Sequence, residues 1–255
     1  MLLNLYLKIM IFVFLLASAV PALADTPVVA AMWRAELKAV DQKLRAKQWA
    51  PAEKLARKAA YDIAELAGTG EGASYSLAVV SAFRAIAAAG LGKTEDAAWH
   101  WDTALNLFPD IAKTDVSPYG SAAVELRTRK LREAEPDDLR KQLLDRLKGG
   151  NGSVLVDTKE GERNITPPRI IKQPRISFPT ALNLLGSEGV VVVSAVIGED
   201  GRLREPRVIE LRGGGPAMKY VALDALREWR FEPAKLDRTP AAVYYVLTVN
   251  FHDRR

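Results

Sequence analysis

The chain of 255 residues contains no cysteine. That absence excludes disulfides, thiol catalysis, cysteine-based zinc sites and a lipid-modified N-terminal cysteine. Only two histidines occur, and neither has a second histidine or a carboxylate pair at ligand spacing. We interpret His100 as a structural or surface residue and His252 as part of a solvated tail. The sequence also lacks a nucleophile elbow, a His-Glu-x-x-His motif and a paired-carboxylate motif. We therefore expect a protein that is not an enzyme and holds no cofactor and no metal.

A strong charge of one sign is also missing. The formal net charge is only +5, and the basic residues are spread along the chain. A nucleic-acid-binding domain usually gathers its lysines and arginines on one face. We expect no nucleic-acid partner, and the apolar share of 49% is enough to build hydrophobic cores.

Long apolar runs are absent except near the N-terminus, from Ile9 to Val20. This run is shorter than the ~20 residues that span a bilayer, and it is followed by the small-x-small pattern Ala22-Leu23-Ala24. We predict that residues 1–24 form a signal peptide that is cleaved before Asp25, which places the mature chain in the periplasm. The alternative is an uncleaved inner-membrane anchor, because Lys8 is the single basic residue of this region.

The segment 25–148 has the composition of helices. It is rich in Ala, Leu, Lys, Arg and Glu and has few β-branched runs. Thr26-Pro27 suits the start of the first helix, and Gly90-Leu91-Gly92 suits a break between two later ones. We expect helical hairpins. The predicted helices lie near residues 28–47, 50–67, 72–90, 94–108, 118–134 and 136–147.

One stretch of this half has small and aromatic residues at a distinctive spacing. They supply a turn glycine, two small residues, a bulky aromatic and a terminal proline, at Gly92, Ala97, Ala104, Trp101 and Pro109. Small residues let helices approach closely, the aromatic residue fills the gap, and proline ends the helix. A fainter copy consists of Trp49, Ala52, Ala56 and Ala59. The half resembles a degenerate tetratricopeptide repeat (TPR) array of about three hairpins, with an ordinary helical bundle as the alternative.

The helical pattern ends at Gly149-Gly150-Asn151-Gly152, and prolines follow at positions 167, 168 and 174. This density of glycine and proline is typical of a connector. We therefore assign residues 149–175 to a linker. Inside it, Ser153 to Val156 is predicted to be extended, and the sequence leaves open whether this segment pairs.

Farther along the chain the pattern changes to strands. Gly189 to Ile197 is almost entirely valine, Arg207 to Leu211 is short and β-branched, and Val243 to Phe251 alternates. An apolar stripe at helical spacing predicts a helix from Ala217 to Trp229. With one more helix upstream, these elements predict a small domain of two helices and a three-stranded antiparallel sheet. The expected fold class is α+β in two domains, of which the first is all-α.

Several short motifs in this domain together resemble those of a known family. They are Phe178-Pro179-x-Ala181, Glu188-Gly189, Asp200-Gly201 in the first turn, and Trp229-Arg230-Phe231-Glu232-Pro233 after the helix. In this order and spacing they resemble the C-terminal domain of the energy transducer TonB. We assign residues 176–255 to this domain. Its fold signature comprises Phe178, Pro179, Gly189, Gly201, Trp229, Arg230, Phe231 and Pro233.

Two members of the signature have expected structural roles, and two positions depart from the family. Arg230 is expected to hydrogen-bond the last carbonyls of the helix, and Pro233 is expected to stop it. Phe178 stands where the family usually has Tyr. Gln173-Pro174 lies further upstream of Phe178 than in the transducer itself.

The resemblance implies binding by the last strand. In TonB-like domains this strand adds an extended receptor segment, the TonB box, to the edge of the sheet. Alternation along the strand turns four side chains outward, beside the backbone that a partner would meet: Tyr244, Val246, Thr248 and Asn250. Gln173 and Pro174 are further candidates for partner binding. The expected partner is an envelope protein, either a TonB-dependent outer-membrane receptor or a component of the TonB system, and homodimerisation stays open.

Force transmission is not expected, because residues 9–23 contain no histidine of the kind that the family's membrane helix carries. We interpret the protein as a periplasmic, non-enzymatic adaptor. The alternative is a periplasmic scaffold or assembly factor, in which the TPR-like half recognises the partner and the TonB-like module only oligomerises.

Overall fold

The structure is a computed structural model, and it describes residues 33–66, 71–132, 154–155, 165–176 and 188–251. Several predictions of the sequence fall outside the described residues: the signal peptide, the helix near 136–147, Phe178, Pro179 and His252.

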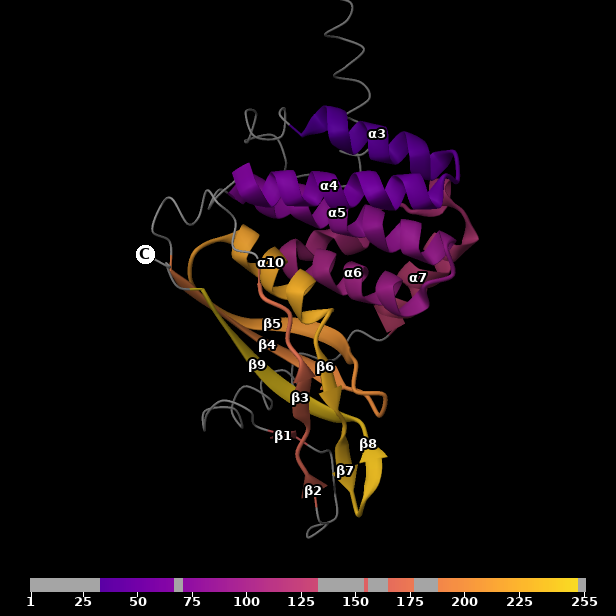
Figure 1. Ribbon diagram of the computed structural model, residues 1–255. Helices are drawn as coiled ribbons and strands as arrows, with labels where there is room; N and C mark the ends of the chain where they lie inside the picture. Colours follow the sequence, from indigo (N-terminus) through magenta and orange to yellow (C-terminus); the bar gives the residue numbers. More distant parts are fainter. Residues whose placement is uncertain (1–32, 67–70, 133–153, 156–164, 177–187, 252–255) are drawn as a thin grey trace, which may run out of the picture.

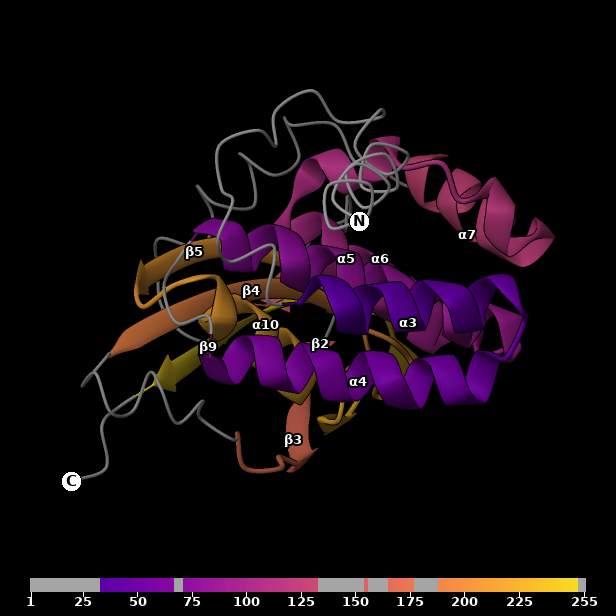
Figure 2. The same ribbon diagram turned by 90° about the horizontal axis from the view of Figure 1, so that it is seen from above.

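The N-terminal half is a stack of helices (Figures 1 and 2). The α-helices are α3 (Arg34–Arg45), α4 (Trp49–Leu66), α5 (Glu71–Gly90), α6 (Thr94–Leu107) and α7 (Ser121–Arg132). The 3-10 turns η1 (Pro109–Lys113) and η2 (Ser117–Tyr119) connect α6 to α7. Each of α3, α4 and α5 packs against the helix that follows it. Five of the six predicted helices are therefore present, and the one near 136–147 lies outside the described residues. Helix α7 begins later than expected because Pro118 lies in η2.

Small residues allow this close packing. A Cβ at Gly90, the last residue of α5, would overlap the Trp49 indole at the start of α4. Three alanines of the fainter repeat copy are buried in α4: Ala52, Ala56 and Ala59. The start of α4 thus packs closely on the end of α5, because the Trp49 ring lies against a residue without a side chain.

The stronger repeat copy lies in α6. Ala97, Trp101 and Ala104 are buried there, and Pro109 opens η1 just beyond the helix. Gly92 has φ +72° in the turn between α5 and α6, a conformation that glycine adopts readily. This packing agrees with a TPR-like hairpin, while the array as a whole stays a prediction.

Helix α5 is the central helix of the stack. Ala73–Gly90 is long and apolar enough to cross a membrane by length and composition, but 78% of this window is buried inside the protein. A buried core helix has the same composition, so α5 supports a membrane span only weakly.

The main sheet of the C-terminal part is antiparallel. It contains β4 (Gly189–Ile197), β5 (Leu203–Gly213), β9 (Val243–Phe251) and the two-residue β1 (Val154–Leu155). Among the described residues the order is β1-β9-β4-β5. The sequence predicts the bounds of β4 and β9, whereas β5 is longer than expected and β1 makes the sheet four-stranded rather than three-stranded.

Two small sheets complete this part and change the predicted linker. In one, β2 (Ile165–Thr166) pairs with β7 (Ala234–Leu236), which also pairs with β8 (Thr239–Ala241). In the other, β3 (Arg169–Lys172) pairs with β6 (Arg230–Glu232). The segment expected to be a linker therefore supplies β1, β2 and β3 to this domain. Each strand has two to four residues, too few to show a period in the sequence.

Helix α10 (Pro216–Leu226) is shorter than predicted. It ends before Trp229 because the following residues form β6, and Pro233 lies between β6 and β7 rather than at the helix end. Pro216 begins the helix, after Gly213 and Gly214 with positive φ. The prediction that Pro233 stops the helix was wrong, since a change to strand conformation already ends it.

The two halves pack into three layers (Figure 1). Helix α10 lies against β4 and β5 on one side and against α4, α5 and α6 on the other, and α6 also packs against β5. The helical half is thus part of the same packed body as the sheet.

Candidate partner-binding edge

The motif residues hold the small domain together. Gly201, in the turn after β4, has φ +73°, and a Cβ there would overlap the carbonyl of Phe231. The Phe231 N–H donates a 2.9 Å hydrogen bond to the Gly201 carbonyl. The Asp200-Gly201 turn therefore closes directly onto β6, which explains why the two motifs occur together.

The other motif residues pack around this contact. Trp229 and Phe231 are buried, with ring centroids 6.4 Å apart. Arg230 Nη1 donates to the carbonyls of Arg227 at 2.9 Å and Trp229 at 2.7 Å. Gly189 begins β4 against the side chain of Met218. These residues support the fold and leave the surface of the sheet to other functions.

The candidate residues of β9 differ in exposure. In register, Tyr244 lies opposite Val196, Val246 opposite Ser194, Thr248 opposite Val192 and Asn250 opposite Val190. Asn250 is exposed, and Tyr244 and Thr248 are half-buried. Val246 was expected to face outward to solvent, but it is buried, as is Ser194 beside it. The centre of this face of the sheet is therefore covered.

One edge of β9 carries β1. Val154 lies opposite Tyr245, and Leu155 lies opposite Tyr244, in antiparallel pairing. The sequence leaves this pairing open, because a two-residue strand has no pattern of its own. Main-chain addition to this edge is thus already present within the chain.

The opposite edge of the sheet, along β5, is bound by a side chain of the helical half. Asn106 of α6 donates from Nδ2 to the Pro206 carbonyl at 2.7 Å and accepts at Oδ1 from the Val208 N–H at 2.7 Å. A carbonyl and an N–H two residues apart point the same way from a strand. The amide therefore takes the place of one peptide group of a neighbouring strand. Sequence reasoning missed Asn106, since nothing local marks it.

Gln173 and Pro174 follow β3, which pairs with β6. Gln173 is exposed and Pro174 is half-buried. The structure thus places these two candidates after the small β3–β6 sheet rather than on the β9 edge.

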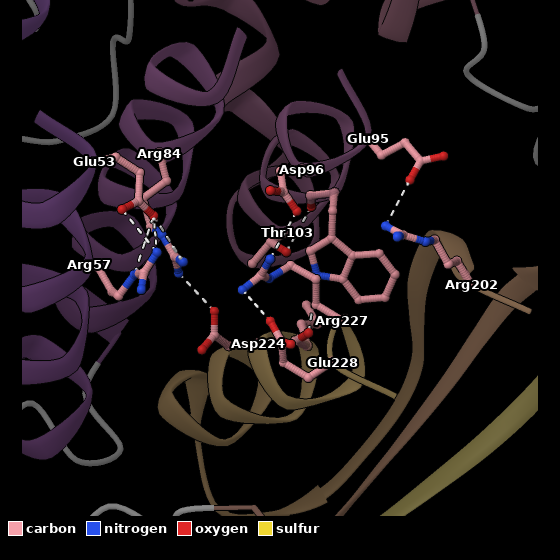
Figure 3. A network of polar contacts seen from close by, with 12 residues as sticks. Glu53, Arg57, Arg84, Glu95, Asp96, Thr103, Arg202, Asp224, Arg227 and Glu228 are labelled. Atoms are coloured by element: carbon pink, nitrogen blue, oxygen red, sulfur yellow. Dashed lines mark hydrogen bonds and ion pairs between the residues drawn. The ribbon is translucent and has the colours of Figure 1, made fainter. Parts of the chain in front are cut away.

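A polar cluster joins the two halves beside α10 (Figure 3). Arg84 of α5 is only 1% exposed. Its Nη1 donates to Tyr220 Oη at 2.9 Å and to Asp224 Oδ1 at 2.8 Å, both on α10. Burial lowers the pKa of Arg84, but its interactions with the Tyr220 hydroxyl and the Asp224 carboxylate raise it above its ordinary value. The guanidinium thus stays charged and ties α10 to the helical half.

Further contacts extend this junction along α6. Trp99 Nε1 donates to the Leu223 carbonyl at 3.1 Å. Arg227 forms a 2.9 Å ion pair with Asp96, and Arg204 forms a 2.9 Å ion pair with Glu95. The junction therefore combines buried hydrogen bonds with charge pairs at its rim.

The described residues contain no group of three His, Cys, Asp or Glu side chains that could hold a metal. His100 is buried, and burial holds its pKa well below the ordinary value, with Arg84 and Arg227 adding to the effect. It is a neutral core residue. A cavity of about 210 Å³ opens at the junction, and among its lining charges Asp102 pairs with Lys130 and Asp96 with Arg227.

These features define a small α+β interaction domain packed on a helical stack. Residues 174–252 match the family model of the Gram-negative bacterial TonB protein C-terminal domain. The chain therefore carries a TonB C-terminal domain over roughly its last third, where the motifs predict one. No curated protein and no solved structure shows significant similarity to the chain.

Domains of this family are non-enzymatic transducer and interaction domains of the bacterial envelope. They interact with envelope proteins such as outer-membrane receptors. The coarse function of this part of the chain is thus protein interaction of the TonB type.

Proposed function

We propose that the protein is a periplasmic, non-enzymatic adaptor that binds an outer-membrane receptor or another envelope partner by β-strand addition to β9. Partner main chain would pair with the edge of β9, flanked by Tyr244, Thr248 and Asn250. Gln173 and Pro174 would make additional contacts beyond β3.

The difference between the two sheet edges carries this proposal. Asn106 and the packing of α6 close the edge of β5. The β9 edge instead carries main chain, in the form of β1. An extended peptide gains affinity through such main-chain pairing and specificity through the side chains beside it. This difference favours the edge of β9 as the place where a partner strand pairs.

The helical half adds a second function to the adaptor. Because it packs on α10 and β5, it leaves the β9 edge on the far side of the sheet (Figure 1). Its TPR-like hairpins would hold another partner on their own surface. In this arrangement the two partners do not compete for the same face.

Site-specific crosslinking tests the proposal. In this cysteine-free chain, Asn250→Cys places one thiol on the β9 edge, and Tyr61→Cys is the matched control because Tyr61 is 54% exposed on α4. Each variant is joined to its neighbours in the periplasm with a short crosslinker, and the adducts are identified by mass spectrometry.

We expect an outer-membrane receptor among the adducts of Asn250→Cys and not among those of Tyr61→Cys. Adducts of Asn250→Cys with the chain itself alone would favour the scaffold whose C-terminal module oligomerises. The same receptor at equal yield from both positions would contradict binding at β9.

A further inference from the structure

Strand β3 is an exposed edge strand outside the main sheet. Among the described residues its one neighbouring strand is β6, and all four of its residues are exposed. In Figure 1 it lies in front of the main sheet, and in Figure 2, turned by 90°, it lies at the margin of the molecule. A strand with one neighbour presents its second row of main-chain N–H and C=O groups to another chain. Strand β3 therefore offers an accessible main-chain edge.

Two neighbouring isoleucines are exposed on this strand. Ile171 is 64% exposed, more than any other large apolar side chain of the described residues, and Ile170 is 40% exposed. Ile170 lies opposite Phe231, but the register shifts before Lys172, so Ile171 is paired with no residue of β6. Such a shift is typical of a β-bulge, which re-aims a side chain. Native proteins usually shield an edge strand with charged side chains, and two exposed isoleucines are the opposite of such shielding.

The surroundings of the isoleucines are basic. Residues 165–176 contain three basic residues and no acidic one. Arg169 pairs with Glu232 at 3.0 Å, but it shares this carboxylate with a second base. Lys172 and Arg175 are exposed, and neither forms an ion pair within the described parts of the chain. The edge therefore carries positive charge that is not neutralised, and this charge is complementary to the carboxylates of a partner.

Prolines limit the length of this edge. Pro168 precedes β3, and Pro174 follows it after Gln173. Proline has no N–H to donate to a further strand. A partner segment can therefore pair over about five residues between the two prolines. So short a contact gives weak binding, with a Kd of about 0.1–1 mM.

We propose that the outer edge of β3 is a second docking edge, which takes an extended acidic segment of a partner protein. The main chain of this segment pairs with β3, its apolar side chains pack on Ile170 and Ile171, and its carboxylates pair with Lys172 and Arg175. The row of main-chain groups favours a peptide over an anionic membrane, because hydrocarbon supplies no hydrogen-bond partners. The inference goes beyond the proposed function, since β3 and β9 belong to different sheets.

Designed peptides test the chemistry of the partner. The probe is a fluorescein-labelled synthetic heptapeptide of alternating glutamate and valine, titrated with the protein by fluorescence anisotropy. A second peptide has lysine in place of every glutamate. A third is the acidic peptide with every main-chain nitrogen methylated, which removes its donors. We expect the acidic peptide to bind at least about tenfold more tightly than either of the others, because it alone supplies both carboxylates and main-chain hydrogen bonds.

Paired substitutions locate the binding on β3. Ile171→Glu/Lys172→Glu removes an apolar contact and reverses a charge, and it should weaken binding of the acidic peptide at least about tenfold. Leu91→Glu/Lys93→Glu is the matched control and should leave the affinity unchanged, because Leu91 is 38% exposed and Lys93 is exposed beside the turn between α5 and α6. Ile171→Val/Lys172→Arg keeps the apolar and basic character and should bind as the native chain does. Thermal unfolding checks the fold of each variant.

Several outcomes would overturn the inference. They are equal affinity for the acidic and basic peptides, no saturable binding up to about 1 mM, and unchanged affinity in Ile171→Glu/Lys172→Glu, which would place the peptide elsewhere. Phosphatidylglycerol vesicles that sediment with the native chain but not with this variant, while the acidic peptide does not bind, would show a membrane-facing surface instead.

The test holds even where the charge reversal disturbs the fold. If Ile171→Glu/Lys172→Glu does not unfold cooperatively, the three peptides on the native chain and the conservative variant decide. The adducts of Asn250→Cys are independent of these results. Strand addition at β9 and docking at β3 can therefore each fail without the other.

Discussion

At the scale of single residues, the junction depends on a buried cation. Arg84 lies in an apolar helix and would be costly without partners, since burying a charge is unfavourable unless it is paired and hydrogen-bonded. Tyr220 and Asp224 supply those partners from a segment about 140 positions away in sequence, at 2.9 and 2.8 Å. The pairing therefore links the folding of α5 to the docking of α10.

Replacing this cation should cost considerable stability. We expect Arg84→Met to lower the free energy of unfolding by about 2–3 kcal/mol, because the buried Tyr220 hydroxyl loses its donor and Asp224 loses its ion pair. Urea denaturation measures the change. Lys113→Met is the control, since Lys113 pairs with Asp110 on the surface and such pairs contribute less than about 1 kcal/mol. Equal losses in the two variants would contradict a special role for Arg84.

A buried ion pair between α6 and α7 should make stability depend on pH. Asp102 is paired with Lys130 at 3.0 Å. Burial raises the pKa of Asp102 from 3.8 to about 6, although Lys130 acts to lower it. The folded state thus binds the Asp102 proton more tightly than the unfolded chain does. This group therefore costs stability as pH rises from about 4 to 6, by about 3 kcal/mol in total, and adds no further change above that range.

The double variant Asp102→Asn/Lys130→Met removes this dependence. We expect the native chain to lose stability relative to the double variant between pH 4 and 6, measured by chemical denaturation at each pH. Each single variant should be the least stable protein near neutral pH, because it leaves one buried partner alone. Parallel pH profiles for the native chain and the double variant would show that Asp102 titrates normally.

At the scale of elements, the turn after β4 is fixed by its contact with β6. Gly201 and Gly92 have almost the same positive φ, +73° and +72°, but only Gly201 faces another backbone. Gly92→Ala should cost about 1 kcal/mol, the strain of a left-handed residue. Gly201→Ala should cost about 3 kcal/mol or more, because the methyl group would overlap the Phe231 carbonyl. Thermal unfolding of both variants measures the difference, and equal losses would mean that β6 moves away freely.

The two edges of the main sheet also differ in what lies along them. An edge strand exposes unpaired N–H and C=O groups, which native proteins usually cover. In this chain the Asn106 amide bonds Pro206 and Val208 of β5, and the two-residue β1 pairs with part of β9. The first is a side chain of a packed helix, whereas the second is main chain, and this difference supports the proposed docking edge.

At the scale of the whole molecule, the two halves form one packed body. Arg84, Trp99 and Asn106 of the helical half each bind the C-terminal domain through hydrogen bonds of 2.7–3.1 Å. Such a junction differs from two domains on a flexible connector, whose relative motion is unrestricted. Partners on the two halves would thus be held at a fixed distance from one another.

Cutting the chain between the halves tests this. With a specific protease site inserted after Gly150, we expect the two pieces to co-elute in size-exclusion chromatography at micromolar concentration after cleavage, because the junction does not depend on the connection. Asn106→Ala, which removes two of the hydrogen bonds, should weaken this association. Separate elution of the cut native chain would show that the covalent connection holds the halves together.

Much of this architecture can be predicted from local sequence. The alanine-rich helices, the valine-rich β4, the alternating β9 and the motif from Trp229 to Pro233 each have a period or spacing that identifies the element and the family domain. These signals are strong because every residue of a long element must satisfy the same packing pattern. The absence of cysteine likewise excludes whole classes of chemistry on composition alone.

Tertiary structure decided the rest, because the decisive contacts join residues far apart in the chain. No local sequence motif indicates that the Asn106 amide bonds β5. No local motif indicates that Arg84 has partners on α10. The linker prediction failed in part because strands of two to four residues are defined by what they pair with, not by their own pattern. The sequence alone determined the long helices and strands and the family of the last domain. Only the packing of those elements determined which side chains and strands lie along the two edges of the main sheet.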